Sequence, residues 1–351
     1  MEFGPSMSYQ VRVTKRKFKK GRFFTILILF IILVAAIVFL FKGGIVKKIN
    51  SVFSSSTTQQ NVGTTTNSST VAGTTQKEST VKSAATSTES SLSNSAETTK
   101  VNVVKDYKKL KSELENYIKG FQGQYGVCFI DLDNGSEFGI NASDAYIAAS
   151  TVKVPINLYL FKKIEDGSIN PTDTMVYQAK DKEGGTGYIQ TKKLGSKYTI
   201  RELSKLSIQV SDNVAVNMLI RLIGKQNYKD FMKQMGGQVV TDKNISCPKD
   251  MAVYLKNVYA FNKSNPTLGG ELIGYLENTV FNDRIPKLLP KDIKVAHKIG
   301  NQVAAIHDVG IVYAEKPYII AVMSKNASEA EGYNVIANIS KKVYDFMTNS
   351  K

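Results

Sequence analysis

The sequence predicts an α+β domain, with an antiparallel five-stranded sheet flanked by helices, preceded by a membrane-spanning helix and a disordered tether. In the C-terminal two thirds of the chain, strand-like runs come first and last and helical runs lie between them, so the terminal strands must pair across the domain. Upstream lie an apolar stretch and a Ser/Thr-rich stretch. The 351 residues therefore divide into a cytoplasmic basic segment (1–22), a transmembrane helix (23–41), a linker (42–103) and a folded domain (104–351).

The positive charge of the chain is concentrated near its N-terminus. The net charge is +16, and ten lysines and arginines lie in the first 50 residues against one acidic residue, Glu2. Because nucleic-acid binding needs basic residues gathered on a folded face, we expect no nucleic-acid partner. The two histidines and two cysteines are too few for a histidine-rich zinc site or a disulfide framework. We therefore expect no metal ion and no cofactor.

Residues 23–41 read FFTILILFIILVAAIVFLF, without a charged residue, Gly or Pro. At about 1.5 Å per residue, this stretch is just long enough to cross a hydrocarbon core of roughly 30 Å. A cleaved secretory signal is the alternative, but its apolar region is shorter and ends at small residues. More basic residues precede the span than follow it, which predicts a single-pass protein of the cell membrane with a cytoplasmic N-terminus and an extracytoplasmic C-terminal domain.

Serine and threonine occupy 26 of the 50 positions from 51 to 100. Aromatic residues are absent from this stretch after Phe53, and branched aliphatic residues are rare. Such a segment cannot bury enough apolar surface to offset its conformational entropy, so we expect a disordered tether.

From residue 104 onward the pattern is that of a globular domain. Residues 104–119 have apolar residues at helical spacing, and residues 125–140 read as two strands joined by a hairpin turn at Asn134-Gly135. Three more strands are expected at 293–300, 307–315 and 318–326, followed by a terminal helix at about 330–348. Helices are expected between these strands at 152–165, 200–210, 213–223, 227–235 and 249–261.

Ser150-Thr151-Val152-Lys153 opens one of these helices, with Pro155 in its first turns. Residues three apart share a helix face, so the hydroxyl of Ser150 and the amine of Lys153 can meet. The positive N-terminus of the helix favours an oxyanion at the same place. The same tetrapeptide also occurs at residues 79–82 in the linker, so the motif alone is not specific.

Two further strings give this motif a context: Ser211-Asp212-Asn213 between two helical runs, and Lys298-Ile299-Gly300 in a strand near the end. In this order and spacing, the three strings resemble those of the penicillin-recognising serine enzymes. The segments SIQVSDNVAVNMLIRLIG, CPKDMAVYL and HDVGIVY resemble their counterparts in class A β-lactamases. The resemblance covers residues 105–349 and implies the β-lactamase and transpeptidase fold, with an all-helical subdomain beside the sheet.

The resemblance implies a role for each catalytic side chain. Ser150 would attack an amide carbonyl and form an acyl-enzyme. Lys153 would accept the proton of Ser150 if its amine were neutral, and a nearby lysine at 298 would lower its pKa. Ser211 would pass the proton to the leaving nitrogen. Asp212 is expected to cap the following helix.

The resemblance also implies the substrate-binding residues. Asn213 would hold the amide of the substrate side chain and orient Lys153, and Lys298 would attract the substrate carboxylate. The backbone amides of Ser150 and Asn301, which follows Gly300, would form the oxyanion hole.

Two departures from the family pattern bear on turnover. Ile299 stands where the family has Thr or Ser, so a hydroxyl that would bind the substrate carboxylate is absent. The stretch from Ser211 to Pro248 is shorter than in class A β-lactamases by roughly the length of their Ω-loop, which carries the glutamate that activates the deacylating water. The acidic residues between Asn213 and Pro248, Asp230 and Asp242, lack the R-x-E-x-x-L-N context of that glutamate. We therefore expect slow deacylation.

Several other residues are expected to be structural. His297 alternates with Lys298 along a strand, so their side chains should lie on opposite faces. His307 begins the next strand and is expected to have a positional role. Cys128 and Cys247 could form a disulfide, although two buried thiols are favoured. The segment 184–187 (Gly-Gly-Thr-Gly) is interpreted as a flexible loop at the edge of the cleft.

The sequence thus predicts a membrane-anchored, extracytoplasmic serine hydrolase that forms an acyl-enzyme with a β-lactam or with the D-alanyl end of a peptidoglycan stem peptide. Two alternatives remain open. One is a DD-peptidase-type penicillin-binding protein, and the other is a non-catalytic wall-binding pseudoenzyme that keeps the pocket.

Overall fold

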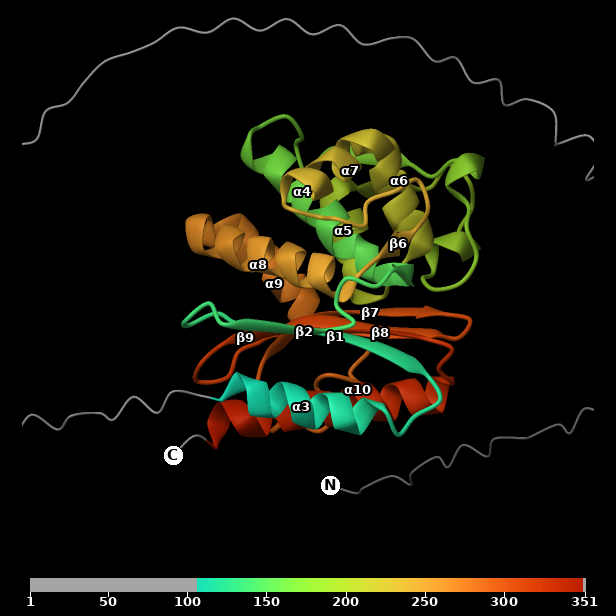
Figure 1. Ribbon diagram of the computed structural model, residues 1–351. Coiled ribbons are helices and arrows are strands. Elements are labelled where there is room, and N and C mark those ends of the chain that lie inside the picture. Colours follow the sequence, from blue (N-terminus) through green and yellow to red (C-terminus); the bar gives the residue numbers. More distant parts are fainter. Residues whose placement is uncertain (1–105, 350–351) are drawn as a thin grey trace, which may run out of the picture. The chain divides into compact units, whose positions relative to one another are not determined.

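The computed structural model describes residues 106–349 of the chain (Figure 1). The expected basic segment, transmembrane helix and linker, together with the second copy of the serine-lysine motif, lie outside these residues. Among the residues described, no helix is both long and apolar enough to cross a bilayer.

A five-stranded antiparallel sheet forms the centre of the domain, in the order β2-β1-β9-β8-β7. The first strand of the N-terminal hairpin, β1, pairs along its full length with the last strand, β9, and Val127 lies opposite Val322. This confirms that the ends of the domain meet in one sheet. The strands are β1 (Gln124–Asp131), β2 (Glu137–Ile140), β7 (Val295–Gln302), β8 (Ala305–Val312) and β9 (Tyr318–Lys325).

Helices cover both faces of the sheet (Figure 1). Helices α3 (Tyr107–Ile118) and α10 (Glu329–Thr348) lie on one face, and α8 (Pro248–Ser264) and α9 (Pro266–Glu277) lie on the other. The alternation of β1 explains how one strand serves both layers, since its side chains point to opposite faces in turn. Val127 and Phe129 belong to the apolar core with α3 and α10, whereas Cys128 and Ile130 belong to the core with α8.

A helical subdomain lies beyond α8 and α9, on the side of the sheet away from α3 and α10 (Figure 1). The expected helices are all present, with ends that differ by three residues or fewer. The α-helices of this subdomain are α4 (Lys153–Glu165), α5 (Ile200–Gln209), α6 (Asn213–Ile223) and α7 (Lys225–Gln234). Three 3₁₀ helices are also described: η1 (Ala149–Val152), η2 (Ala179–Asp181) and η3 (Ile189–Thr191).

The structure adds α9, which the sequence analysis missed. Its three glycines weaken helix propensity, yet Asn265 caps its first turn by accepting a hydrogen bond from the Leu268 amide at 3.1 Å. Leu272 and Leu276 are buried against the rest of the core. Packing therefore outweighs the poor local propensity of this segment.

Two short strand pairs were also missed. β4 (Thr174–Val176) pairs with β5 (Lys197–Thr199) in the helical subdomain. β3 (Tyr146–Ile147) pairs with β6 (Ile245–Ser246), in the connection from α7 to α8. Because β3 leads directly into η1, this second pair fixes the short connection beside Ser150.

Candidate active site

Ser150 lies in η1, the 3₁₀ turn that precedes α4, and not in the α-helix itself. The preceding residue, Ala149, has a positive φ of 48°, a conformation that costs free energy for a residue with a side chain. Thr151 holds the turn by donating from its hydroxyl to the Ala148 carbonyl at 2.6 Å. Backbone strain is therefore found immediately beside the hydroxyl that was expected to be the nucleophile.

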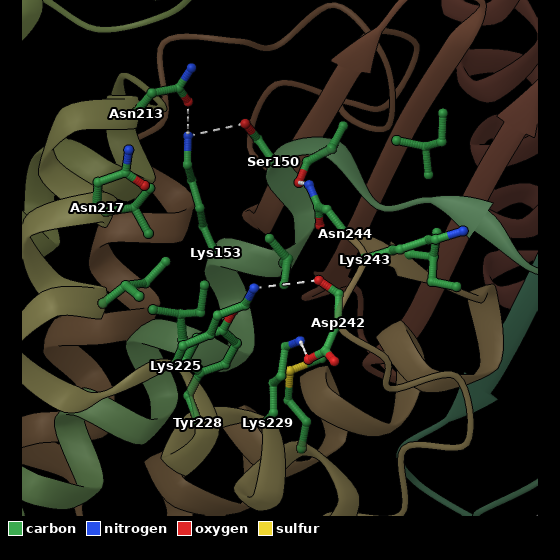
Figure 2. Close-up of a pocket in the computed structure, with 18 of the residues that line it drawn as sticks. Ser150, Lys153, Asn213, Asn217, Lys225, Tyr228, Lys229, Asp242, Lys243 and Asn244 are labelled. Atoms are coloured by element: carbon green, nitrogen blue, oxygen red, sulfur yellow. Dashed lines mark hydrogen bonds and ion pairs between the residues drawn. The ribbon is translucent and has the colours of Figure 1, made fainter. Parts of the chain in front are cut away.

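The amine of Lys153, the first residue of α4, is surrounded by four oxygens, and Figure 2 shows its contacts with Ser150 and Asn213. It lies 3.1 Å from Ser150 Oγ, 3.2 Å from Ser211 Oγ, and 2.7 Å from both the Ser211 carbonyl and Asn213 Oδ1. The expected meeting of the Ser150 hydroxyl and the Lys153 amine is present, and the amine also contacts the second motif.

Ser211 connects the second motif to the third. Lys298 on β7 donates to Ser211 Oγ at 3.0 Å and to the backbone carbonyl of Ile299, the next residue along β7, at 3.2 Å. Ser211 is also one of the non-glycine residues with positive φ, at 55°. A continuous series of contacts therefore runs from Ser150 through Lys153 and Ser211 to Lys298.

Burial changes the acidity of both lysines. The Lys153 pKa is lowered from 10.5 to about 7 because the amine is withdrawn from water, although the negative charges of Asp212 and Glu183 oppose the shift. The Lys298 pKa is lowered well below its usual value by complete burial and by the charge of Lys153. Two ammonium ions this close in a buried site repel each other, so the pair favours a state in which at least one amine is neutral.

Asp212 is the N-cap of α6, as expected. Its Oδ1 accepts from the Ala215 amide at 2.9 Å, and its Oδ2 accepts from the amides of Tyr188 and Ile189 at 2.8 and 2.9 Å. Asp212 is fully buried. The carboxylate thus joins the start of α6 to the loop that precedes η3.

That loop, which was expected to be a flexible edge, is attached to the second motif. Thr186 donates to the Ser211 carbonyl at 2.7 Å, and Asn213 Nδ2 donates to the Gly184 carbonyl at 2.7 Å. A β-carbon at Gly187 would lie 2.2 Å from Asp212 Cγ, and the φ of Gly187 is 97°. Because glycine alone combines this backbone conformation with the absence of a β-carbon, only glycine fits there. The contribution of Thr186 to the site was missed, and the run of glycines was its only signal.

The third motif lies against η1. A β-carbon at Gly300 would be 3.1 Å from the Ala148 carbonyl, so glycine allows β7 to approach the nucleophile turn closely. Ile299 is buried. Asn301 lines the same cavity as Ser150, while its side chain donates to the Tyr333 hydroxyl at 2.9 Å. Ser150 and Asn301, the expected pair of oxyanion-hole residues, are therefore brought to one cavity.

The cavity beside Ser150 has a volume of about 710 Å³ and a mixed polar and apolar lining (Figure 2). Its walls include Lys153 and Asn213 at the nucleophile, together with residues of α6, α7 and the connection from α7 to α8. Nine of the polar lining residues were not predicted from the sequence: Glu183, Asn217, Lys225, Tyr228, Lys229, Thr241, Lys243, Asn244 and Gln302. Of these, Asn244 donates to the Ala149 carbonyl at 3.2 Å and so contacts the nucleophile turn.

Asp242 also lines the cavity but belongs to a different group of side chains. Its side chain is 95% exposed and forms an ion pair with Lys229 Nζ at 3.0 Å, and Lys225 Nζ lies 3.4 Å from its backbone carbonyl. The hydrogen bond from Lys229 lowers the pKa of the Asp242 carboxyl. In Figure 2, Asp242 lies with Lys225 and Lys229, apart from the group formed by Ser150, Lys153 and Asn213.

The histidines and cysteines are buried, and both histidines have structural partners. His297 Nδ1 lies 2.9 Å from Asp308 Oδ1, and His307 Nε2 lies 2.6 Å from the Ile147 carbonyl, next to the nucleophile turn. Cys128 and Cys247 are both free thiols, which answers the question that the sequence left open. Between residues 106 and 349, no group of three or more His, Cys, Asp or Glu side chains is arranged to hold a metal ion.

Comparison with known proteins gives a consistent result. Residues 109–347 match the model of a family described as the β-lactamase enzyme family. The extended-spectrum β-lactamase PER-1 of Pseudomonas aeruginosa is 24% identical over 267 residues, which cover 68% of this chain and 87% of that protein. The β-lactamase ROB-1 of Haemophilus influenzae is 25% identical, with 66% and 82% of the two chains covered.

Solved structures show the same fold. The structure of PBP-A superposes with a TM-score of 0.65 at 24% identity, covering 69% of this chain and 96% of that one. A β-lactamase from Sphaerobacter thermophilus superposes with a TM-score of 0.63 at 23% identity. A mutant of PBP-A, with a TM-score of 0.65, was solved as its acyl-enzyme complex with penicillin G.

Proposed function

The chain belongs to the β-lactamase enzyme family and is a β-lactamase-like serine hydrolase, and from this premise we propose that Ser150 forms an acyl-enzyme with β-lactams or with D-alanyl peptidoglycan peptides. The observation that carries the proposal is the placement of Ser150 Oγ, 3.1 Å from an amine with a lowered pKa. A serine hydroxyl becomes an effective nucleophile when such a base accepts its proton.

The contacts of Lys153 are compatible with a neutral amine, which burial favours. Its two shortest contacts, both 2.7 Å, are to the Ser211 carbonyl and Asn213 Oδ1, which only accept hydrogen bonds. A neutral amine has two hydrogens and one lone pair. The two hydrogens satisfy these two oxygens, and the lone pair is then available to the hydroxyl of Ser150 or Ser211. Proton transfer from Ser150 to Lys153 therefore requires no rearrangement of the site.

Ser211 and Lys298 complete the proposed acylation step. Ser211 Oγ lies between the amines of Lys153 and Lys298, so it can pass the proton from Lys153 to the leaving nitrogen. Lys298 attracts the substrate carboxylate by its charge. The arriving carboxylate favours the protonated form of Lys298, and the ammonium charge at Lys298 in turn helps to keep Lys153 neutral.

Deacylation is proposed to be slow. Among the described residues, the carboxylates that line the cavity are those of Glu183 and Asp242. Glu183 accepts a hydrogen bond from Asn217 at 2.7 Å, Asp242 is held by Lys229, and neither is hydrogen-bonded to Ser150. Water that approaches the acyl-enzyme therefore lacks a carboxylate base held at Ser150, and a positioned base usually contributes a factor of about 10² to 10⁴.

The acylation rate should depend on the protonation of Lys153. Because the Lys153 pKa is about 7, the fraction of neutral amine rises with pH, and the second-order rate constant of acylation should rise through a midpoint near neutrality. Below that midpoint it should fall about tenfold per pH unit. Stopped-flow acylation by a chromogenic cephalosporin between pH 5 and pH 9 measures this profile.

The variant Lys153→Ala supplies the control for the pH profile. We expect it to lose a factor of about 10² to 10⁴ in acylation rate and to lose the midpoint near neutrality. If Lys153→Ala kept the wild-type profile, another group would have to be the proton acceptor.

We further propose that residues 23–41 anchor the protein in the cell membrane, with the hydrolase domain outside. The proposal is supported by the apolar composition and length of this segment and by the excess of basic residues before it. Protease added to intact cells should remove the domain and leave a small membrane-bound fragment. A domain that becomes sensitive only after the cells are lysed would reverse the proposed orientation.

A further inference from the structure

The cavity at Ser150 is larger than the reacting amide requires. It extends from the nucleophile to α7 and to the connection between α7 and α8 (Figure 2). We call the part at Tyr228 and Asp242, which Figure 2 shows away from Ser150, its far end. Val240, Thr241 and Met232 also line the cavity. The cavity therefore offers space beyond the residues that contact the nucleophile.

The far end of the cavity carries an excess of positive charge. Lys225, Lys229 and Lys243 line the cavity, and Figure 2 shows Lys225 and Lys229 on one side of Asp242 and Lys243 on the other. Asp242 neutralises Lys229, at 3.0 Å. Lys225 donates to the backbone carbonyl of Asp242, and its charge also acts on the Asp242 carboxylate. Between residues 106 and 349, neither Lys225 nor Lys243 forms an ion pair. Two of the three lysines are therefore available to an anionic ligand.

An unused hydroxyl lies in the same region. Tyr228 is 7% exposed, and within the described part of the chain its hydroxyl has no hydrogen-bond partner. The neighbouring lining is apolar and includes Ile220, Met232 and Val240. The region thus combines an apolar wall with a donor and two unpaired cations, which suits an aliphatic chain that ends in an anion.

These features define which part of a substrate could occupy the region. The carboxylate next to the leaving nitrogen is assigned to Lys298 on β7, whereas the basic end of the cavity is built from α7 and the connection that follows it. An anion bound there must therefore belong to another part of the substrate. The acyl group, which stays attached to Ser150 after the leaving nitrogen has departed, is the part that reaches from the nucleophile into the cavity.

We propose that this basic end is a binding subsite for a carboxylate carried on an extended acyl group, with Lys225 and Lys243 as its cationic residues and Tyr228 as a hydrogen-bond donor. The inference rests on the proposed acylation of Ser150. It identifies the preferred substrate as an acyl donor with two carboxylates, one near the leaving nitrogen and one at the end of the acyl chain. A peptide with an acidic residue upstream of the cleaved amide has this chemistry.

Two penicillins that differ in one group test the subsite. One carries an adipoyl side chain that ends in a carboxylate, and the other carries the same chain ending in a carboxamide. With the full-length protein, we expect the carboxylate probe to acylate Ser150 about fivefold faster, in keeping with the strength of partly exposed charge pairs. The preference should shrink as salt is added, because exposed charges are screened.

The variants assign the preference to the lysines. In Lys225→Gln/Lys243→Gln the two probes should acylate at nearly equal rates, and in Lys225→Glu/Lys243→Glu the carboxamide probe should become the faster one. Lys233→Gln is the matched control, because Lys233 is on the same helix, pairs with Asp230 and does not line the cavity. This control should keep the wild-type preference.

The possible failures can be told apart. Equal acylation of the wild-type protein by the two probes would overturn the subsite and leave the acyl-enzyme intact. A preference that survives in Lys225→Glu/Lys243→Glu would also overturn it. Absence of an adduct with either probe would overturn the acyl-enzyme itself, and the subsite with it.

Discussion

Ser150→Ala is expected to abolish covalent labelling by β-lactams. In the structure, the Ser150 hydroxyl meets the Lys153 amine at 3.1 Å and lies in a cavity with Asn213 and Asn301. Alanine removes the only atom that can form the ester bond and leaves the turn able to fold. A fluorescent penicillin, followed by denaturing gel electrophoresis, should label the wild-type protein and give no band with the variant.

Two controls accompany this measurement. Ser79→Ala alters the second copy of the tetrapeptide, which lies in the linker, and should leave labelling unchanged. Ser168→Ala alters an exposed hydroxyl in the loop after α4 and should also be neutral. Labelling of Ser150→Ala at the wild-type level would show that another residue is the nucleophile.

The second large effect concerns turnover. With no base positioned by the short connection, the acyl-enzyme should accumulate, and a chromogenic β-lactam should give a burst of about one product per enzyme, followed by a slow steady rate. The deficit in deacylation relative to a site with a placed carboxylate should be about 10² to 10⁴. Rapid-mixing kinetics over several enzyme concentrations separate the burst from the steady rate.

Two variants test whether either carboxylate in the cavity takes part. Asp242 is 95% exposed and paired with Lys229, and Glu183 is hydrogen-bonded to Asn217. We expect Asp242→Asn and Glu183→Gln to leave the slow rate unaltered. Steady hydrolysis without a burst, abolished by one of these changes, would show that a carboxylate of the cavity acts as the deacylating base.

The sheet could be predicted because its pattern is local. The apolar run of β1 and the turn at Asn134-Gly135 indicate a hairpin, and three apolar runs near the end supply the other strands of the sheet. Helix α9 could not be predicted in the same way. Its glycines argue against a helix, and the burial of Leu272 and Leu276 that stabilises it becomes visible only in the folded domain.

The residues of the active site likewise include some that could be predicted from the sequence and some that could not. Ser150, Lys153, Ser211, Asn213 and Lys298 are recognisable because each stands in a short motif, and the structure brings them together. Thr186 and Asn244 have no such motif. Their contacts, with the Ser211 and Ala149 carbonyls, depend on loops that are positioned by distant segments. The basic end of the cavity was missed for the same reason, because Lys225 and Lys243 are separated by a whole helix.

The central claim is that Ser150 forms a long-lived acyl-enzyme, and a time course of intact mass tests it most directly. A β-lactam opens its ring on acylation and keeps its leaving nitrogen attached, so the adduct should add the whole mass of penicillin G. We predict that this adduct forms at one per chain, maps to the peptide that contains Ser150 and persists long after free penicillin is removed. A protein mass that stays unmodified throughout, or an adduct that maps to another peptide, would contradict the account.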